Sequence, residues 1–258
     1  MLLFTRSSTQ PGGTYRANVN SDEQHRRNRL LAALRPQDYA LLKPHLQIVP
    51  IGEGDLLHRP GEEIKQVHFL LRGIVSLMAV SKDGDAISTA SVGREGAVGT
   101  IAGTGVVRAF TRAMVQTPGA ASRIAISHFR RAVSESEAIT DLLTRYHMAL
   151  MAQVQQTSLC NSVHDAASRL SRLLLLLNEQ GNDDTISFTQ ERLADMLALR
   201  RTSVTLAART LQSRRLITYR RGRIEIVDRE GLKAAACECY GVVSRTFDQF
   251  LEDKQATG

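Results

Sequence analysis

The segment between Gln190 and Leu211 constrains the fold more than any other part of the sequence. Counted from Gln190 as position one, apolar or small residues occupy positions 4, 5, 8, 9, 10, 15 and 18, where the two helices of a helix-turn-helix must pack closely. At position 9, in the turn, Ala198 replaces the more usual Gly, which has greater backbone freedom. The spacing predicts two packed helices, the second from about Arg201 to Ser213. The seven residues are Leu193, Ala194, Leu197, Ala198, Leu199, Val204 and Ala207.

The polar residues of the second helix indicate a DNA-reading face. In the stretch "LALRRTSVTLAARTLQ", arginines and hydroxyl residues fall on the side opposite Val204 and Leu211. Arginine reaches guanine, whereas short hydroxyl side chains reach phosphate oxygens or base edges. The alternative is a pair of packed helices with a solvated basic face. The residues that we expect to contact DNA are Thr189, Gln190, Arg200, Arg201, Thr202, Ser203, Thr205, Arg209, Arg221 and Arg223.

The charge distribution supports the same interpretation. Nine arginines and two acids lie between Phe188 and Arg223, so this stretch carries +7, which equals the net charge of the whole chain. The run "RRLITYRRGRIEIV" follows the second helix and predicts two short strands around Arg221 and Gly222. Such a hairpin is a wing, and its arginines would contact the sugar–phosphate backbone.

The N-terminal half has a different residue pattern. Glycines recur between short apolar runs from residue 47 to 126, and Asp83-Gly84 is typical of a hairpin turn. This pattern predicts an antiparallel β-roll of jelly-roll type in an α+β chain. We expect a flexible leader over 1–26, the roll over 27–126, a long helix over 127–158, a winged helix-turn-helix domain over 159–228 and a helical extension over 229–258.

The long helix carries an apolar stripe with spacings of three and four residues. The stripe favours a dimer seam with heptad-like packing, and the alternative is a helix buried in the subunit core. A homodimer would bring two recognition helices to a near-palindromic operator. The expected seam consists of Ile139, Leu142, Leu143, Tyr146, Leu150 and Val154.

The chain contains three cysteines, Cys160, Cys237 and Cys239, which are too few for a disulfide framework. Cys237 and Cys239 would point to different faces of a helix, so we expect reduced structural thiols and no metal site. No apolar run reaches the length of a membrane span, and the N-terminal apolar stretch is too short for a signal peptide. A cytoplasmic protein without membrane contacts is therefore expected.

The order of roll, long helix and winged helix-turn-helix resembles the Crp/Fnr family of bacterial transcription regulators over residues 28–228. The segments on which the resemblance rests are "GDLLHRPGEEIKQVHFLLRGIVSL", "REGAVGT", "AASRLSRLLLLL" and "TQERLADMLALRRTSVTLAARTLQSRRLITYRRGRIEI". Arg201, Ser203 and Val204 match the family's recognition helix. Thr202 replaces its acid and Leu206 its second arginine, so the usual TGTGA-like half-site is not carried over.

The resemblance also places a candidate effector pocket in the roll, at Gly99, Thr100, Ile101, Thr111 and Arg112. Cyclic-nucleotide-binding members have Gly-Glu-Leu at the first segment and Arg-Ser-Ala at the second. The acid is missing here and the arginine is out of order, which argues against cyclic AMP. Because no cysteine precedes Cys160, an iron–sulfur cluster is also not expected. The scattered His45, His58 and His68 are expected to be solvated or structural rather than haem ligands.

These observations predict a homodimeric, sequence-specific transcription regulator that binds double-stranded DNA. RNA polymerase and an unidentified small-molecule effector are further candidate partners. The alternative is a ligand-binding or protein-interaction module whose helix-turn-helix does not read DNA. An enzyme, such as a metal-dependent oxygenase on the roll, is not expected because the sequence has no close ligand pair of the His-x-His type.

Overall fold

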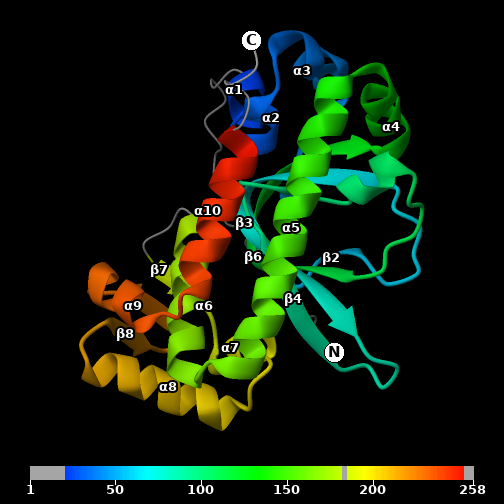
Figure 1. Cartoon of the computed structure of the whole chain (residues 1–258). Helices are drawn as coiled ribbons and strands as arrows, with labels where there is room; N and C mark the ends of the chain where they lie inside the picture. The colour runs from blue at the N-terminus through cyan, green and yellow to red at the C-terminus, as the bar shows by residue number, and fades with distance from the viewer. Residues whose placement is uncertain (1–20, 182–184, 253–258) are drawn as a thin grey trace, which may run out of the picture.

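The computed structural model describes residues 21–181 and 185–252. Figure 1 shows a β-rich part and a smaller C-terminal part, with the long helix α5 (Glu137–Val163) running beside both. The strands of the β-rich part are β1 (Gln47–Ile51), β2 (Leu56–His58), β3 (Gln66–Val80), β4 (Ala86–Val92), β5 (Ala97–Val98) and β6 (Arg112–Ala125). Its helical elements are α1 (Ser21–His25), α2 (Arg29–Ala33), α3 (Pro36–Leu42), η1 (Lys43–His45), η2 (Thr100–Thr104) and α4 (Ile126–Glu135).

An antiparallel sheet forms the predicted roll. Its strands run in the order β1-β6-β3-β4, while β2 pairs with β6 and β5 pairs with β3. The long partners β3 and β6 stay in register over most of their length, with shifts near Arg72 and Ile74. At that bend, a Cβ on Gly119 would lie 2.1 Å from Arg72 O, so only glycine allows this close approach of the two strands.

The N-terminal helices are anchored to the roll. The predicted leader, 1–26, lies outside the described residues up to residue 20, but from Ser21 the chain is helical. His25 is buried, with Nδ1 2.7 Å from Ser122 Oγ in β6. Asn28 is buried as well and donates to Leu70 O and Gly96 O. The last residues of the predicted leader therefore belong to the folded domain.

Two helices replace the single helix expected over 127–158. Ser136 has an extended backbone, caps α5 by accepting from Ile139 N, and donates from Oγ to Asp38 Oδ1. This cap separates α4 from α5, and α5 continues to Val163, beyond the predicted end.

The C-terminal helix α10 (Cys239–Glu252) packs along α5 (Figure 1). Val243 and Phe247 of α10 share a core with α5, and Phe247 contacts the Tyr146 ring at a centroid distance of 6.5 Å. This packing corrects the expected dimer seam, because four of its residues are buried inside the subunit and Leu150 is half-buried, whereas Val154 is exposed. The four are Ile139, Leu142, Leu143 and Tyr146.

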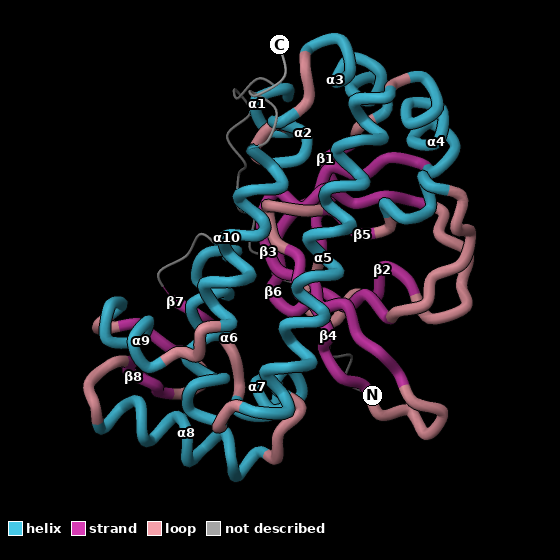
Figure 2. Tube along the Cα trace, viewed as in Figure 1, coloured by secondary structure: helices cyan, strands magenta, loops and turns pink. Residues whose placement is uncertain are grey.

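The C-terminal part contains α6 (Ala166–Gly181), β7 (Thr185–Ser187), α7 (Gln190–Leu197), α8 (Arg201–Ser213), β8 (Ile217–Arg220), β9 (Arg223–Ile226) and α9 (Arg229–Ala235). Its three strands form a small sheet in the order β7-β9-β8. Figure 2 shows the helices α6, α7 and α8 gathered beside this sheet. Leu232 of α9 is buried in one core with residues of α6, α7 and α8, whereas α10 packs on α5. The structure thus divides the predicted extension, 229–258, of which 253–258 lie outside the described residues, between the winged domain and α5.

No helix within the described ranges is both long enough and apolar enough to cross a bilayer.

Candidate nucleic-acid interface

The helix-turn-helix consists of α7 and α8. Thr189 caps α7, where its Oγ1 accepts from Arg192 N. The helix ends at Ala198, which adopts the left-handed conformation with φ of 50°. The apolar side of α8 is fully buried, including Val204, which is 0% exposed. Of the seven expected packing positions, Leu199 is half-buried and Ala198 is exposed in the turn, whereas the other five share one buried core. The five are Leu193, Ala194, Leu197, Val204 and Ala207.

A solvent-open groove lies between α8 and the wing. Its volume is about 330 Å³, and six of the ten residues expected to contact DNA line it. Thr205 Oγ1 lies 2.7 Å from Gln190 Oε1 and so links the start of α7 to α8. The six are Thr189, Gln190, Arg201, Thr205, Arg209 and Arg221.

The other four expected contact residues lie around this groove. Arg200 is the N-cap of α8, and both Arg200 and Thr202 are exposed at the start of the helix. Ser203 is half-buried, and Arg223 is exposed at the start of β9. Leu206, where the family pattern has an arginine, is 67% exposed, so an apolar group stands on this outer face.

The wing turn presents arginine side chains to solvent. Arg221 and Gly222 join β8 to β9 with φ angles of 51° and 78°. Positive φ at both central residues is the geometry of a two-residue hairpin turn of type I′. Arg220, Arg221 and Arg223 are all exposed. The wing and α8 therefore place several guanidinium groups around one groove.

The residues of the predicted effector site lie beside different parts of the roll. Gly99 follows β5, which pairs with the start of β3 at His68, whereas Arg112 pairs with Met78 near the end of β3. Thr100 is buried and its Oγ1 lies 3.0 Å from His147 Nε2 in α5. Thr111 instead lies 3.4 Å from His58 Nε2, and Ile101 packs in a small apolar cluster. The effector pocket therefore stays a prediction that rests on the resemblance, with its residues beside both ends of β3.

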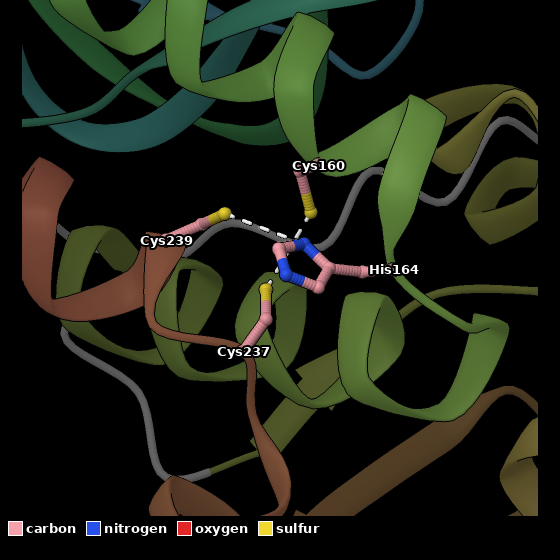
Figure 3. A group of neighbouring side chains, drawn as sticks. All are labelled: Cys160, His164, Cys237 and Cys239. Atoms are coloured by element: carbon pink, nitrogen blue, oxygen red, sulfur yellow. Dashed lines mark hydrogen bonds between the residues drawn. The ribbon is translucent and has the colours of Figure 1, made fainter.

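The three cysteines meet in space, which the sequence analysis missed. Cys237 lies in the bend between α9 and α10 rather than on a helix, so it and Cys239 can point the same way. Both approach Cys160 and His164 at the end of α5 (Figure 3). The hydrogen bond between Cys160 and Cys237 lowers the pKa of Cys160 to about 5 and raises the pKa of Cys237. The sequence-based expectation that Cys237 and Cys239 point to different faces of a helix is therefore wrong, and the thiols belong to a four-residue cluster with His164.

Two of the three histidines noted in the roll are buried. His58 and His68 are both buried, and desolvation lowers the pKa of each, that of His68 to about 4. His45 instead stacks on His128 with ring centroids 3.8 Å apart.

The fold and this groove define a β-roll protein with a winged helix-turn-helix domain. Residues 168–235 match the family model of the Crp-like helix-turn-helix domain. No curated protein matches the chain at the sequence level.

Solved structures share the arrangement of about three quarters of this chain. FixK2 from Bradyrhizobium japonicum is 13% identical with a TM-score of 0.65, covering 74% of this chain and 98% of its own. The CRP-family regulator TTHB099 from Thermus thermophilus is 20% identical with a TM-score of 0.60, covering 73% and 96%. CLP, a c-di-GMP-responsive regulator from Xanthomonas campestris, is 13% identical with a TM-score of 0.59, covering 74% and 99%.

The chain thus has the fold of the Crp/Fnr transcription regulators and carries their type of helix-turn-helix domain, which confirms the resemblance inferred from the sequence.

Proposed function

We propose that this protein is a transcription regulator that binds double-stranded DNA as a homodimer at a near-palindromic operator. The observation that carries the proposal is the groove between α8 and the wing, where Arg201, Arg209 and Arg221 surround an open space. The N-terminal part of α8 would enter the major groove, and the wing would follow the phosphate backbone. This is a binding function, with no catalytic step assigned.

The exposed face of α5 supports a dimer. Apolar side chains recur there at helical spacing, including Met148 and Met151, which are 47% and 48% exposed. Val154, Leu159 and Val163 continue this exposed apolar face toward the DNA-binding end. Two copies of α8 that enter successive major grooves must lie about 34 Å apart, one helical turn of DNA, and a two-fold axis along this face would relate them.

The proposal extends to control of that spacing. A small-molecule effector that binds one dimer geometry more tightly would change DNA affinity, and DNA would change effector affinity by the same factor. RNA polymerase is the partner through which a bound dimer would alter transcription.

Selection from random DNA, followed by affinity measurements, tests the proposal. Arg201→Ala should cost about 1–3 kcal/mol at one position of the selected site and relax the preference there. Arg209→Ala should act similarly at another position. Arg131→Ala removes the same charge from exposed α4 and is the matched control, with unchanged affinity.

Salt dependence separates DNA reading from the alternative function, a protein-interaction module. Arg221→Ala should weaken binding to all sequences and reduce the salt slope by about one, because one phosphate contact is lost. The proposal would be contradicted if the DNA affinity of the unsubstituted protein did not depend on salt. It would also be contradicted if the Arg201 and Arg209 variants bound the selected site as tightly as the unsubstituted protein.

A further inference from the structure

Four potential metal ligands converge where α5 ends. Cys160 is in the last turn of α5, and His164 is in the two-residue link between α5 and α6. Cys237 and Cys239 come from the bend that leads into α10, more than 70 residues later. All four donor atoms lie within 4.8 Å of one another, and the imidazole points between the three sulfurs (Figure 3).

The separations suit one tetrahedral ion. Cys160 Sγ lies 3.5 Å from Cys237 Sγ, and His164 Nδ1 lies 3.5 Å from Cys239 Sγ. Zinc binds cysteine sulfur at about 2.3 Å, so sulfur atoms at the corners of its tetrahedron are about 3.8 Å apart. Small side-chain rotations would therefore complete the geometry without backbone movement.

The histidine is already oriented for this role. Its Nε2 lies 3.2 Å from Glu238 Oε1, which leaves Nδ1 facing the thiols. A carboxylate that accepts the second imidazole proton is the usual outer partner of a zinc-bound histidine, since it fixes the tautomer and ring orientation. Gln156 Nε2 also lies 3.0 Å from Cys239 Sγ, so an amide can donate to the sulfur.

Buried cations beside the cluster favour a negatively charged centre. Arg169 and Arg172 are only 6% and 8% exposed, and their guanidinium groups donate to neutral acceptors. Arg169 donates to Asn161 Oδ1 and Leu197 O, and Arg172 to Thr157 Oγ1. Each keeps a buried Nε without a hydrogen-bond partner within the described part of the chain. Since Zn²⁺ with three thiolates and a neutral imidazole carries one net negative charge, the zinc–thiolate centre would offset one of these two buried positive charges.

We propose that Cys160, His164, Cys237 and Cys239 bind one Zn²⁺ ion in a closed, structural site. The donor set is of the Cys₃His type, which fills all four positions of a tetrahedron and leaves none for a substrate. The ion would join the end of α5 and its link to α6 with the start of α10. It would thereby fix the angle between the long helix and the domain that carries α8.

Metal analysis of the full-length protein, purified under reducing conditions, tests the site directly. We expect one zinc per chain, and after removal with a chelator, one equivalent of Co²⁺ should give the thiolate charge-transfer and tetrahedral ligand-field bands. Zn²⁺ should displace the cobalt and protect three thiols from alkylation. These measurements need no variant and do not depend on DNA binding, so they remain informative if the proposed function fails.

Variants then identify the ligands. Cys237→Ser, Cys239→Ser and His164→Ala should each abolish stoichiometric binding, whereas Glu238→Gln should weaken it by about 10–100-fold. His128→Ala, which removes an exposed imidazole from α4, is the matched control and should bind one equivalent.

Three results would overturn the proposal: three reactive thiols and no tetrahedral cobalt spectrum in the intact protein, a Cys160–Cys237 disulfide that persists under the reducing conditions, or iron with inorganic sulfide in place of zinc.

Discussion

Arg192 Nη1 lies 2.5 Å from Glu53 Oε1, and this ion pair joins the first helix of the helix-turn-helix to the β-roll. The same guanidinium donates to Gln116 O in β6 and lies over the Phe188 ring, 4.9 Å from its centroid. Arg192 is the third residue of α7, where a capping box would have an acid. The structure thus uses this position to connect two domains, and one of the nine arginines that suggested DNA binding serves a different purpose.

This connection predicts unequal effects for its two partners. Glu53→Gln should lower the free energy of unfolding by less than about 1 kcal/mol, because the pair is partly exposed. Arg192→Ala should cost about 1–3 kcal/mol, since it also leaves the carbonyl of Gln116 without its donor. Urea denaturation of both variants checks the difference. Equal losses would show that the contact with Gln116 contributes little.

The turn of the helix-turn-helix predicts a stabilising substitution. Ala198 has φ of 50°, where an L-residue pays about 1–2 kcal/mol relative to the right-handed region. Glycine avoids this cost, but it also gives the unfolded chain more conformational entropy, which lowers the stability of the folded state by about 0.4–1 kcal/mol. Ala198→Gly should therefore raise the free energy of unfolding by up to about 1 kcal/mol in urea denaturation. Ala208→Gly in the middle of α8 is the control and should be destabilising.

The exposed face of α5 predicts where the dimer can be broken. Met151→Glu places a charge on that face in both copies, so the dissociation constant should rise about 100-fold or more. Sedimentation velocity over a concentration series measures this shift. Ile87→Glu alters an exposed apolar residue of β4 and should leave association unchanged. A dimer that tolerates Met151→Glu would place the interface elsewhere.

Buried histidines predict a loss of stability in acid. Desolvation, followed by the nearby Arg123 and His58, lowers the pKa of His68 from 6.5 to about 4. Below pH 6.5 the unfolded chain takes up this proton while the folded chain does not, so stability falls between about pH 6.5 and 4. The contribution amounts to about 3 kcal/mol at most. Urea midpoints across this range should show a shallower pH slope for His68→Gln, and an identical slope would contradict the assignment.

Local spacing explains why the DNA-binding part could be predicted. The contacts between α7 and α8 join residues close in sequence, so seven apolar or small positions were sufficient to place both helices. The charge around Arg201 and Arg221 follows from the same short segment. Thr189 and Gln190 line the groove, and a helix start has a local signature that allowed them to be selected, while their contact with DNA stays a prediction.

Long-range packing explains what the sequence did not reveal. The stripe through Leu142 and Tyr146 is apolar for a reason that periodicity cannot distinguish, since a partner helix from the same chain or from a second copy needs the same pattern. Cys160 and Cys237 are separated by 77 residues, so their contact follows from the path of α9 and α10. The turns of the roll decide which strand ends meet, so the sequence alone could not place the expected effector residues relative to one another.

Helix α10 has a practical consequence for anyone dividing this protein into pieces. A fragment that stops after the wing would retain the helix-turn-helix but lose Val243 and Phe247 of α10, and so uncover part of the core that they share with Tyr146 of α5. Exposed apolar stripes of this kind associate readily. Such a fragment would oligomerise through a surface that is buried in the intact chain. Its oligomeric state would therefore differ from that of the intact chain for a reason created by the truncation.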